Sequence, residues 1–224
     1  MNPYALSITV LSLALGTTAT LTSHHWVLAW VGLEINTLAI IPLMTKNPHP
    51  RAIEAATKYF LTQAAASALI LFASTMNAWL TGEWAINTHM DATPTILISI
   101  ALAMKLGIAP FHFWLPDVLQ GLTLQTGLIL STWQKLAPMV LLIQVAPYTN
   151  LSLLLALGLL STLIGGWGGI NQTQIRKILA FSSIAHLGWM LAILKISPQL
   201  TMLNFALYIL KTFTLFLTFI FINT

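Results

Sequence analysis

The chain is organised around one stretch, MKLGIAPFHFWLPD at positions 104–117. The stretch begins inside a long apolar run, where it carries Lys105, and it is then broken by Gly107, Pro110 and Pro116. A helix that spans a bilayer is expected to run unbroken and to avoid a cation near its middle, because unpaired backbone groups and charges are costly in hydrocarbon. Both departures fall within a few residues, so the stretch predicts a discontinuous membrane helix with a function at its break.

Composition supports a membrane location. Of the 224 residues, 57% are hydrophobic and only 6% are charged, whereas a soluble domain carries about 25% charged residues. These values predict an all-α, polytopic transmembrane bundle. The 9 Lys and Arg residues are spread thinly and form no basic patch, which argues against nucleic-acid binding. The chain has 0 Cys, which excludes thiolate catalysis, Cys-ligated iron–sulfur clusters and disulfides.

Apolar runs of about 20 residues, the length that crosses a bilayer, predict about eight spans in one domain over residues 1–224. The expected helices cover 3–21, 25–45, 56–80, a fourth from about 93 that is interrupted between Gly107 and Pro110, 122–145, 151–170, 178–194 and 200–222. Residues 46–51 are expected to form a loop, since their two prolines cannot sit inside a helix. The last run reaches the final residue, so we expect the domain to be incomplete at its C-terminus.

Basic residues near the predicted helix ends are divided unevenly between the two sides of the membrane. The side of the N-terminus has Lys46, Arg51, Lys58, Arg176 and Lys177, and the opposite side has Lys195 with the acidic Glu83 and Asp91. The positive-inside rule therefore predicts that the N-terminus lies on the negative side of the membrane.

Five ionisable residues lie near the middle of apolar runs: Glu34, Lys105, Lys135, His186 and Lys211. At about 1.5 Å of rise per residue, each falls near the centre of a hydrocarbon core about 30 Å thick. A charge at that depth costs at least about 2.5–3.5 kcal/mol. Five at one depth suggest a hydrated, inward-facing row in the membrane plane. The alternative is a set of structural ion pairs and hydrogen bonds that fix helix packing.

Proton transfer is the chemistry that such a row supports. Burial disfavours a charged lysine and a nearby carboxylate favours it, so Glu34 beside a lysine would form a switch. Histidine is a natural relay between lysines, because it changes charge near neutral pH. The break between Gly107 and Pro110 is expected to leave carbonyls free to bind water or a cation. His112 is either a further relay there or a polar residue that bonds the freed backbone.

Four motifs, taken in order, carry a resemblance to a known family. They are WVGLEIN at 30–36, KLGIAPFHFWLPD at 105–117, WQKLAP at 133–138 and FSSIAHLGW at 181–189. They resemble the antiporter-like subunits of respiratory complex I and the related multisubunit cation/proton antiporters. The residues of these motifs are most similar to those of mitochondrially encoded animal members, and the resemblance covers the whole chain.

The resemblance implies roles for these residues. Glu34 and Lys105 would form the carboxylate–lysine pair of a proton channel, and Lys135 would be the central lysine that passes protons laterally. His186, with Ser182 and Ser183, would belong to the central polar axis. Lys211 matches no family motif, and it would face lipid headgroups or a partner. Members of this kind also have further helices and another buried lysine beyond position 224.

The same resemblance implies a core membrane subunit of the proton-translocating NADH:ubiquinone reductase, multi-pass in the mitochondrial inner membrane. Its partners would be other membrane-arm subunits and lipid. This chain would bind no cofactor or metal, and FMN, iron–sulfur clusters and the quinone site would lie in other subunits. Two alternatives stay open. One is a stand-alone cation/proton antiporter of similar fold, and the other is a structural membrane subunit whose buried charges only hold helices together.

Overall fold

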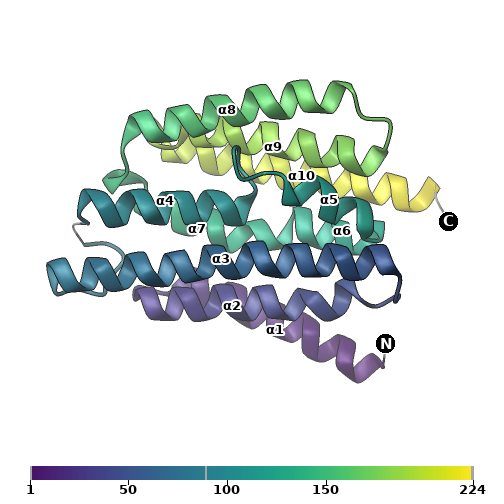
Figure 1. Ribbon diagram of the computed structural model, residues 1–224, viewed down its shortest axis with the longest axis horizontal. Helices are drawn as coiled ribbons and strands as arrows, with labels where there is room; N and C mark the ends of the chain where they lie inside the picture. The colour runs from purple at the N-terminus through teal and green to yellow at the C-terminus, as the bar shows by residue number, and fades with distance from the viewer. Residues whose placement is uncertain (1, 89, 223–224) are drawn as a thin grey trace.

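The computed structural model describes residues 2–88 and 90–222, and these residues form a bundle of helices that run roughly side by side (Figure 1). The helices in chain order are α1 (Pro3–Thr22), α2 (Trp26–Met44), α3 (Pro50–Thr81), α4 (Ala92–Leu106), α5 (Trp114–Gly121), α6 (Leu124–Ser131), η1 (Trp133–Lys135), α7 (Leu136–Val145), η2 (Ala146–Tyr148), α8 (Leu151–Ile170), α9 (Ile175–Leu194) and α10 (Pro198–Ile222). Within the described residues, seven segments are long and apolar enough to cross a membrane, and α4 followed by α5 forms a further, interrupted segment. The prediction of an all-α bundle with a helix broken near Gly107 and Pro110 is confirmed.

The interrupted helices lie in the middle of the bundle. Figure 1 shows α1–α3 along one side, α8–α10 along the other, and α4–α7 between them, with both termini at one end. Helix α3 packs against α4 and α5, α7 packs against α4, and α9 packs against α5. Each break is therefore enclosed by neighbouring helices, which can bond the backbone groups that a break exposes.

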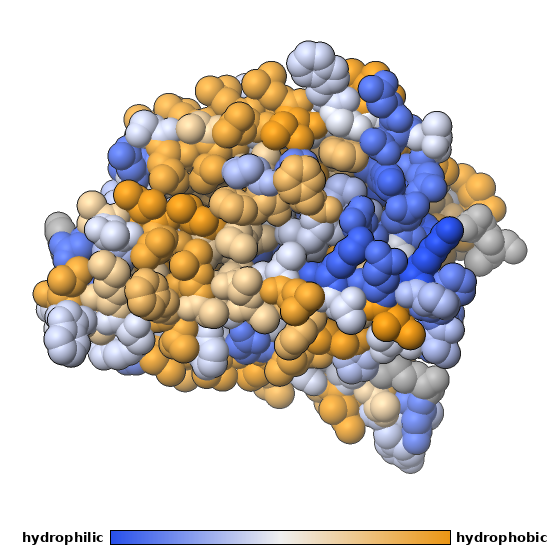
Figure 2. All heavy atoms as spheres, viewed as in Figure 1, coloured by the Kyte–Doolittle hydropathy of each residue, from blue (hydrophilic) through white to orange (hydrophobic). Residues whose placement is uncertain are grey.

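The surface divides into a hydrophobic middle and a hydrophilic end. Figure 2 shows hydrophobic side chains over the middle of the bundle, and hydrophilic side chains gathered at the end where the termini lie. The last residues of α2 and the first residues of α3 and α9 meet this end. It therefore includes the basic residues that the sequence assigned to the side of the N-terminus.

Helix α3 starts earlier than predicted. The segment 46–51 was expected to be a loop, yet the helix begins at Pro50 and its first turn includes Arg51. A proline is tolerated at the first helical position, since the N–H that it lacks would have no partner there. The side chain of His49 caps this end by accepting a hydrogen bond from the Arg51 N–H at 3.2 Å.

The break in the fourth predicted span follows from its glycine and prolines. Helix α4 ends at Leu106, and Gly107 closes it in the left-handed region with φ of 76°, which a residue with a Cβ rarely adopts. The chain resumes a regular helix only at Trp114. The break predicted between Gly107 and Pro110 is confirmed.

A second break lies where a continuous helix over 122–145 was predicted. Helix α6 ends at Ser131, a 3₁₀ turn covers Trp133–Lys135, and α7 begins at Leu136. Pro138 has no N–H for the carbonyl of Gln134, and its ring crowds that carbonyl, so the α-helical pattern cannot run through this turn. The turn places Lys135 at a helix discontinuity, as Gly107 does for Lys105.

Candidate functional site

Lys105 is buried in the last turn of α4, with 5% of its surface exposed. Its ammonium Nζ donates a hydrogen bond to the Ser67 hydroxyl of α3 at 2.6 Å. The Lys105 carbonyl accepts a hydrogen bond from Gln63 Nε2 at 3.3 Å, also from α3. Both ends of the residue are thus held by α3, which fixes the ammonium at the break.

The carbonyls at the end of α4 have partners within the protein. Trp114 Nε1 of α5 donates to the Met104 carbonyl at 3.1 Å, and the Ile108 N–H donates to the Ala103 carbonyl at 2.9 Å. With Gln63 on the Lys105 carbonyl, the last turn of α4 is satisfied by α3 and α5. We expected the break to leave backbone carbonyls free to bind water or a cation, and this expectation is wrong for the carbonyls of residues 103–105. The ionisable side chains remain as the groups available for chemistry.

Glu34 lies half-buried on α2, and its Oε2 accepts a hydrogen bond from the Thr37 hydroxyl at 3.0 Å. Among residues 2–88 and 90–222, the ion pairs within 4.0 Å all involve Lys58, so Glu34 and Lys105 are not in direct contact. The predicted pair is therefore not a salt bridge in this structure, and the Lys105 ammonium bonds Ser67 instead.

Lys135 is buried at the second break, with 3% of its surface exposed. Its Nζ donates to the Tyr208 hydroxyl of α10 at 2.8 Å and lies 5.0 Å from the centre of the same ring, within range of a cation–π interaction. The Tyr208 hydroxyl donates in turn to the Ser131 carbonyl at 3.1 Å. Tyr208 therefore links the ammonium of Lys135 to the carbonyl that the end of α6 leaves free.

The two buried lysines line the same narrow cavity. Its walls come from α2 to α7 and include Thr37, Tyr59 and Trp114 beside Lys105 and Lys135. It offers about 10 Å³ for the centre of a water molecule, which is room for about one water. The structure thus brings together the lysines of the two breaks, with a space between them that suits a bridging water.

The second break is also tied to α2. Gln134 Nε2 donates to the Asn36 carbonyl at 3.1 Å, and both residues line the cavity. Asn36 is two positions from Glu34 on α2. The elements that carry Glu34 and Lys135 are therefore positioned directly against each other.

His186 lies on the surface of the described chain, although it was expected to face inward. The buried positions of α9 around it are Ser183, Ile184 and Leu187, and the helical period leaves His186 beside the stripe that they form. Its Nδ1 is 2.7 Å from the Ser182 carbonyl, and its ring centre is 5.8 Å from that of Tyr208. Within the described residues His186 is therefore exposed and does not face inward, yet it adjoins the lysine row through Tyr208.

His112 lies in the first break but outside the cavity that the lysines line. It is buried, and its ring contacts Phe113 and Phe181 of α9, at 4.3 and 6.4 Å between centres. Its Nδ1 has no hydrogen-bond partner within the described ranges. Lys211, the fifth ionisable residue in the apolar runs, is exposed on α10. The structure therefore separates both residues from the pair Lys105 and Lys135.

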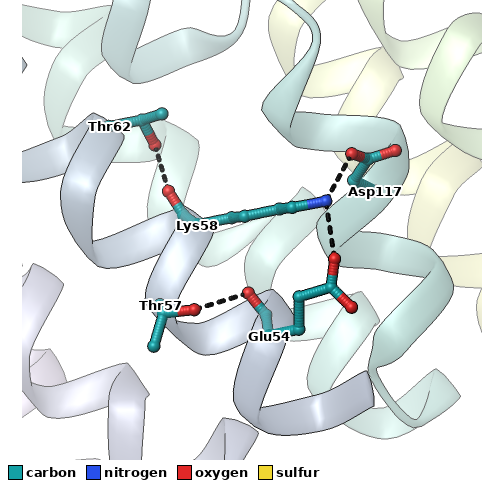
Figure 3. A network of polar contacts seen from close by, with 5 residues as sticks. All are labelled: Glu54, Thr57, Lys58, Thr62 and Asp117. Atoms are coloured by element: carbon teal, nitrogen blue, oxygen red, sulfur yellow. Dashed lines mark hydrogen bonds and ion pairs between the residues drawn. The ribbon is translucent and has the colours of Figure 1, made fainter. Parts of the chain in front are cut away.

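An ionic network joins α3 to α5 near the hydrophilic end. Figure 3 shows the Lys58 ammonium between two carboxylates, at 2.9 Å from Glu54 and 3.0 Å from Asp117. The three side chains are between 42% and 63% exposed. Exposed pairs of this kind contribute little to stability, so Lys58 is a cation of the same helix bundle that is not part of the buried row.

Tyr208, like Ser67, is a residue of this site that sequence analysis missed. It lies in the apolar run of α10 and is 2% exposed. A tyrosine at mid-span carries a hydroxyl that needs a partner in hydrocarbon. That requirement was the available signal, but the sequence does not say which helix supplies the partner.

Comparison with known proteins places this site in a family context. The profile of the family described as NADH:quinone oxidoreductase/Mrp antiporter, transmembrane, matches residues 23–224. The chain is 69% identical over 218 residues to NADH-ubiquinone oxidoreductase chain 2 of Aquarana catesbeiana, which covers 97% of this chain and 63% of that protein. It is 63% identical over 224 residues to the protein of the same name from Squalus acanthias, which covers 100% of this chain and 64% of that protein. The chain therefore spans less than two thirds of the length of these relatives.

Solved structures share the fold. A chain of respiratory complex I from Thermus thermophilus with bound aureothin superposes with a TM-score of 0.90 and 31% identity, covering 96% of this chain and 51% of that chain. A chain of the Mrp complex from a Dietzia species superposes with a TM-score of 0.87 and 20% identity, covering 93% and 43% respectively. The second similarity concerns the fold alone.

Proposed function

Because the chain belongs to the NADH:quinone oxidoreductase/Mrp antiporter transmembrane family, we propose that it acts in a core membrane subunit of respiratory complex I, the proton-translocating NADH:ubiquinone reductase. The names and high identity of the curated relatives support this assignment. They also support a location in the mitochondrial inner membrane, with other membrane-arm subunits as partners. FMN, the iron–sulfur clusters and the quinone are bound by those other subunits, and this chain moves protons.

One observation carries the proposal: two buried lysines, each at a helix break, line one water-sized cavity. Lysine is costly at this depth unless it is paired or has a function. Here the hydrogen-bond partners of Lys105 and Lys135 are the neutral hydroxyls of Ser67 and Tyr208. Neutral partners hold the amine in place in either charge state, which suits a proton carrier better than a structural ion pair.

The proposed path crosses the bundle from α2 to α10. In this path, a movement of the Glu34 carboxylate on α2 leads Lys105 to release its proton to a water in the cavity. The water passes a proton to the Lys135 amine. Tyr208 accepts the hydrogen bond of the Lys135 ammonium and donates its own to the Ser131 carbonyl, which holds the Lys135 proton in place near the ring of His186. Redox energy from neighbouring subunits would set the position of Glu34 relative to Lys105.

Replacement of Tyr208 by phenylalanine tests this path. Tyr208→Phe keeps the ring but removes the hydroxyl that accepts the Lys135 hydrogen bond. A hydrogen bond to a charged group is worth about 1.5–3 kcal/mol, so we expect proton movement per electron to fall about tenfold or more in complex reconstituted into liposomes. The complex is expected to assemble normally, because the ring still fills its site.

Tyr148→Phe is the matched control. The Tyr148 hydroxyl donates to the Asn87 carbonyl at 2.7 Å in an exposed setting beyond the end of α7. Its loss is expected to leave proton movement unchanged. Equal proton movement in Tyr208→Phe and wild type would contradict the path through α10, and failure of assembly alone would favour a structural role for Tyr208.

A further inference from the structure

A basic cavity opens at the hydrophilic end of the bundle, apart from the buried lysines. It has a volume of about 610 Å³, and its lining includes Lys46, His49, Arg51 and Arg176. No Asp or Glu among the described residues lines it. Arg176 already donates to the carbonyls of Gln120 and Leu122, at 3.2 and 2.7 Å, and is thereby fixed in place. The cavity therefore presents unneutralised positive charge on a rigid frame.

The side chains of Lys46 and Arg51 are the free cations of this cavity. Both residues are exposed, and neither forms an ion pair or a side-chain hydrogen bond within the described part of the chain. The carboxylate nearest to Arg51 in sequence, Glu54, is paired with Lys58. An anionic group in the cavity would meet two mobile cations and one fixed cation.

An apolar groove lies next to this cavity, closer to the middle of the bundle. It has a volume of about 460 Å³ and is lined almost entirely by apolar side chains of α1, α6, α7 and α10. Ile129 of α6 lines both spaces, so the two lie next to each other along α6. On α1, Leu6 lines the basic cavity, whereas Val10, Leu13 and Ala14 line the groove. From Leu6 to Ala14 the helix rises by about 12 Å, close to the depth of one hydrocarbon leaflet.

The combination selects one class of ligand. A basic site at the membrane interface suits a phosphate, and basic pockets between transmembrane helices bind anionic headgroups. An apolar groove that descends by one leaflet suits an acyl chain. We propose that the cavity and the groove together bind one anionic phospholipid, with its phosphate between Lys46, Arg51 and Arg176 and one acyl chain against Leu13 and Ile129. The site is independent of proton movement through Lys105 and Lys135.

Photo-crosslinking tests this site in the assembled membrane complex. The complex is placed in phosphatidylcholine nanodiscs that contain phosphatidylglycerol with a diazirine on its acyl chain, and adducts are mapped by mass spectrometry after illumination. We expect adducts on groove residues of α1 and α6, including Leu13. Diazirine-labelled phosphatidylcholine is expected to label these residues weakly. Equal labelling by both lipids would overturn the proposal.

Charge variants provide the matched comparison. Each basic residue near an anionic headgroup contributes about fivefold in binding, so Lys46→Gln combined with Arg51→Gln is expected to reduce labelling by about thirtyfold. Lys177→Gln removes a cation of the first turns of α9 that does not line the cavity or the groove, and it is expected to change nothing. Labelling that is insensitive to the double change would also overturn the proposal.

Three further experiments identify what binds in the cavity and the groove. Ala14→Phe narrows the groove while leaving the cations in place, and it is expected to reduce labelling strongly. Inorganic phosphate at millimolar concentration is expected not to displace the lipid, since it lacks the acyl chain. Displacement by phosphate would instead assign the cavity to a free anion. Replacement of Leu13 by a photoreactive residue that then captures a neighbouring polypeptide would assign the groove to a partner helix.

Discussion

Lys105→Met is expected to remove most of the redox-driven proton movement while leaving the complex assembled. Methionine has a similar length and fills the same buried space, but it cannot hold a proton. Loss of the Lys105 ammonium leaves the Ser67 hydroxyl without its partner at 2.6 Å. That hydroxyl can instead donate to the backbone of its own helix, as the Ser74 hydroxyl does. Protons moved per electron, measured in liposomes with NADH as reductant, are expected to fall by at least about tenfold, as for loss of a proton-transfer group.

Lys58→Met is the control for this prediction. It makes the same chemical change on a lysine of the same bundle, but Lys58 pairs with Glu54 and Asp117 in an exposed network (Figure 3). We expect it to leave both assembly and proton movement unchanged. Normal proton movement in an assembled Lys105→Met complex would refute the role of Lys105 as a carrier. Loss of assembly without a change per assembled complex would support the structural alternative.

Gly188→Val is expected to prevent normal packing of α8 against α9. A Cβ at Gly188 would lie 2.0 Å from the Ser161 hydroxyl and 2.8 Å from the Gly158 carbonyl, both on α8. The clash involves backbone, so rotation of a side chain cannot relieve it, and the helices must separate. Overpacking of this kind costs about 1–3 kcal/mol or more. We expect the amount of assembled complex on native gels to fall strongly.

Gly166→Val serves as the matched control, because it places the same side chain on α8 at a position where a Cβ meets nothing within 4 Å. It is expected to assemble as well as the wild type. If both variants assemble equally, the close approach of α8 and α9 is not required. If both fail, the cost comes from valine in this helix and not from the contact.

The first break could be predicted from sequence because its cause is local. Gly107 and the following prolines disrupt a helix whatever surrounds them, and the apolar runs on either side establish a membrane span. The burial of Lys105 and Lys135 followed in the same way from their depth in those runs. Local chemistry and bilayer thickness thus determined the positions of the two lysines.

Other features of the site depend on neighbouring helices and could not be predicted from a single apolar run of the sequence. The break at Lys135 was missed because a single proline, Pro138, is often accommodated within a membrane helix. The link from Lys135 to Tyr208 joins residues 73 positions apart and requires α10 to pack beside α6. The outward position of His186 depends on which stripe of α9 the other helices cover. The depth of an ionisable residue in the membrane follows from its position in an apolar run of the sequence. The direction of its side chain and its hydrogen-bond partners depend on how the helices pack.

The central claim is that Lys105 and Lys135 act in one series path through their shared cavity. The most direct measurement is the number of protons moved per electron in Lys105→Met, in Lys135→Met and in the double variant. In a series path, either substitution blocks the route, so the double variant is expected to move as many protons as the more impaired single variant. Losses that multiply in the double variant would mean that the lysines act independently, and would contradict the account.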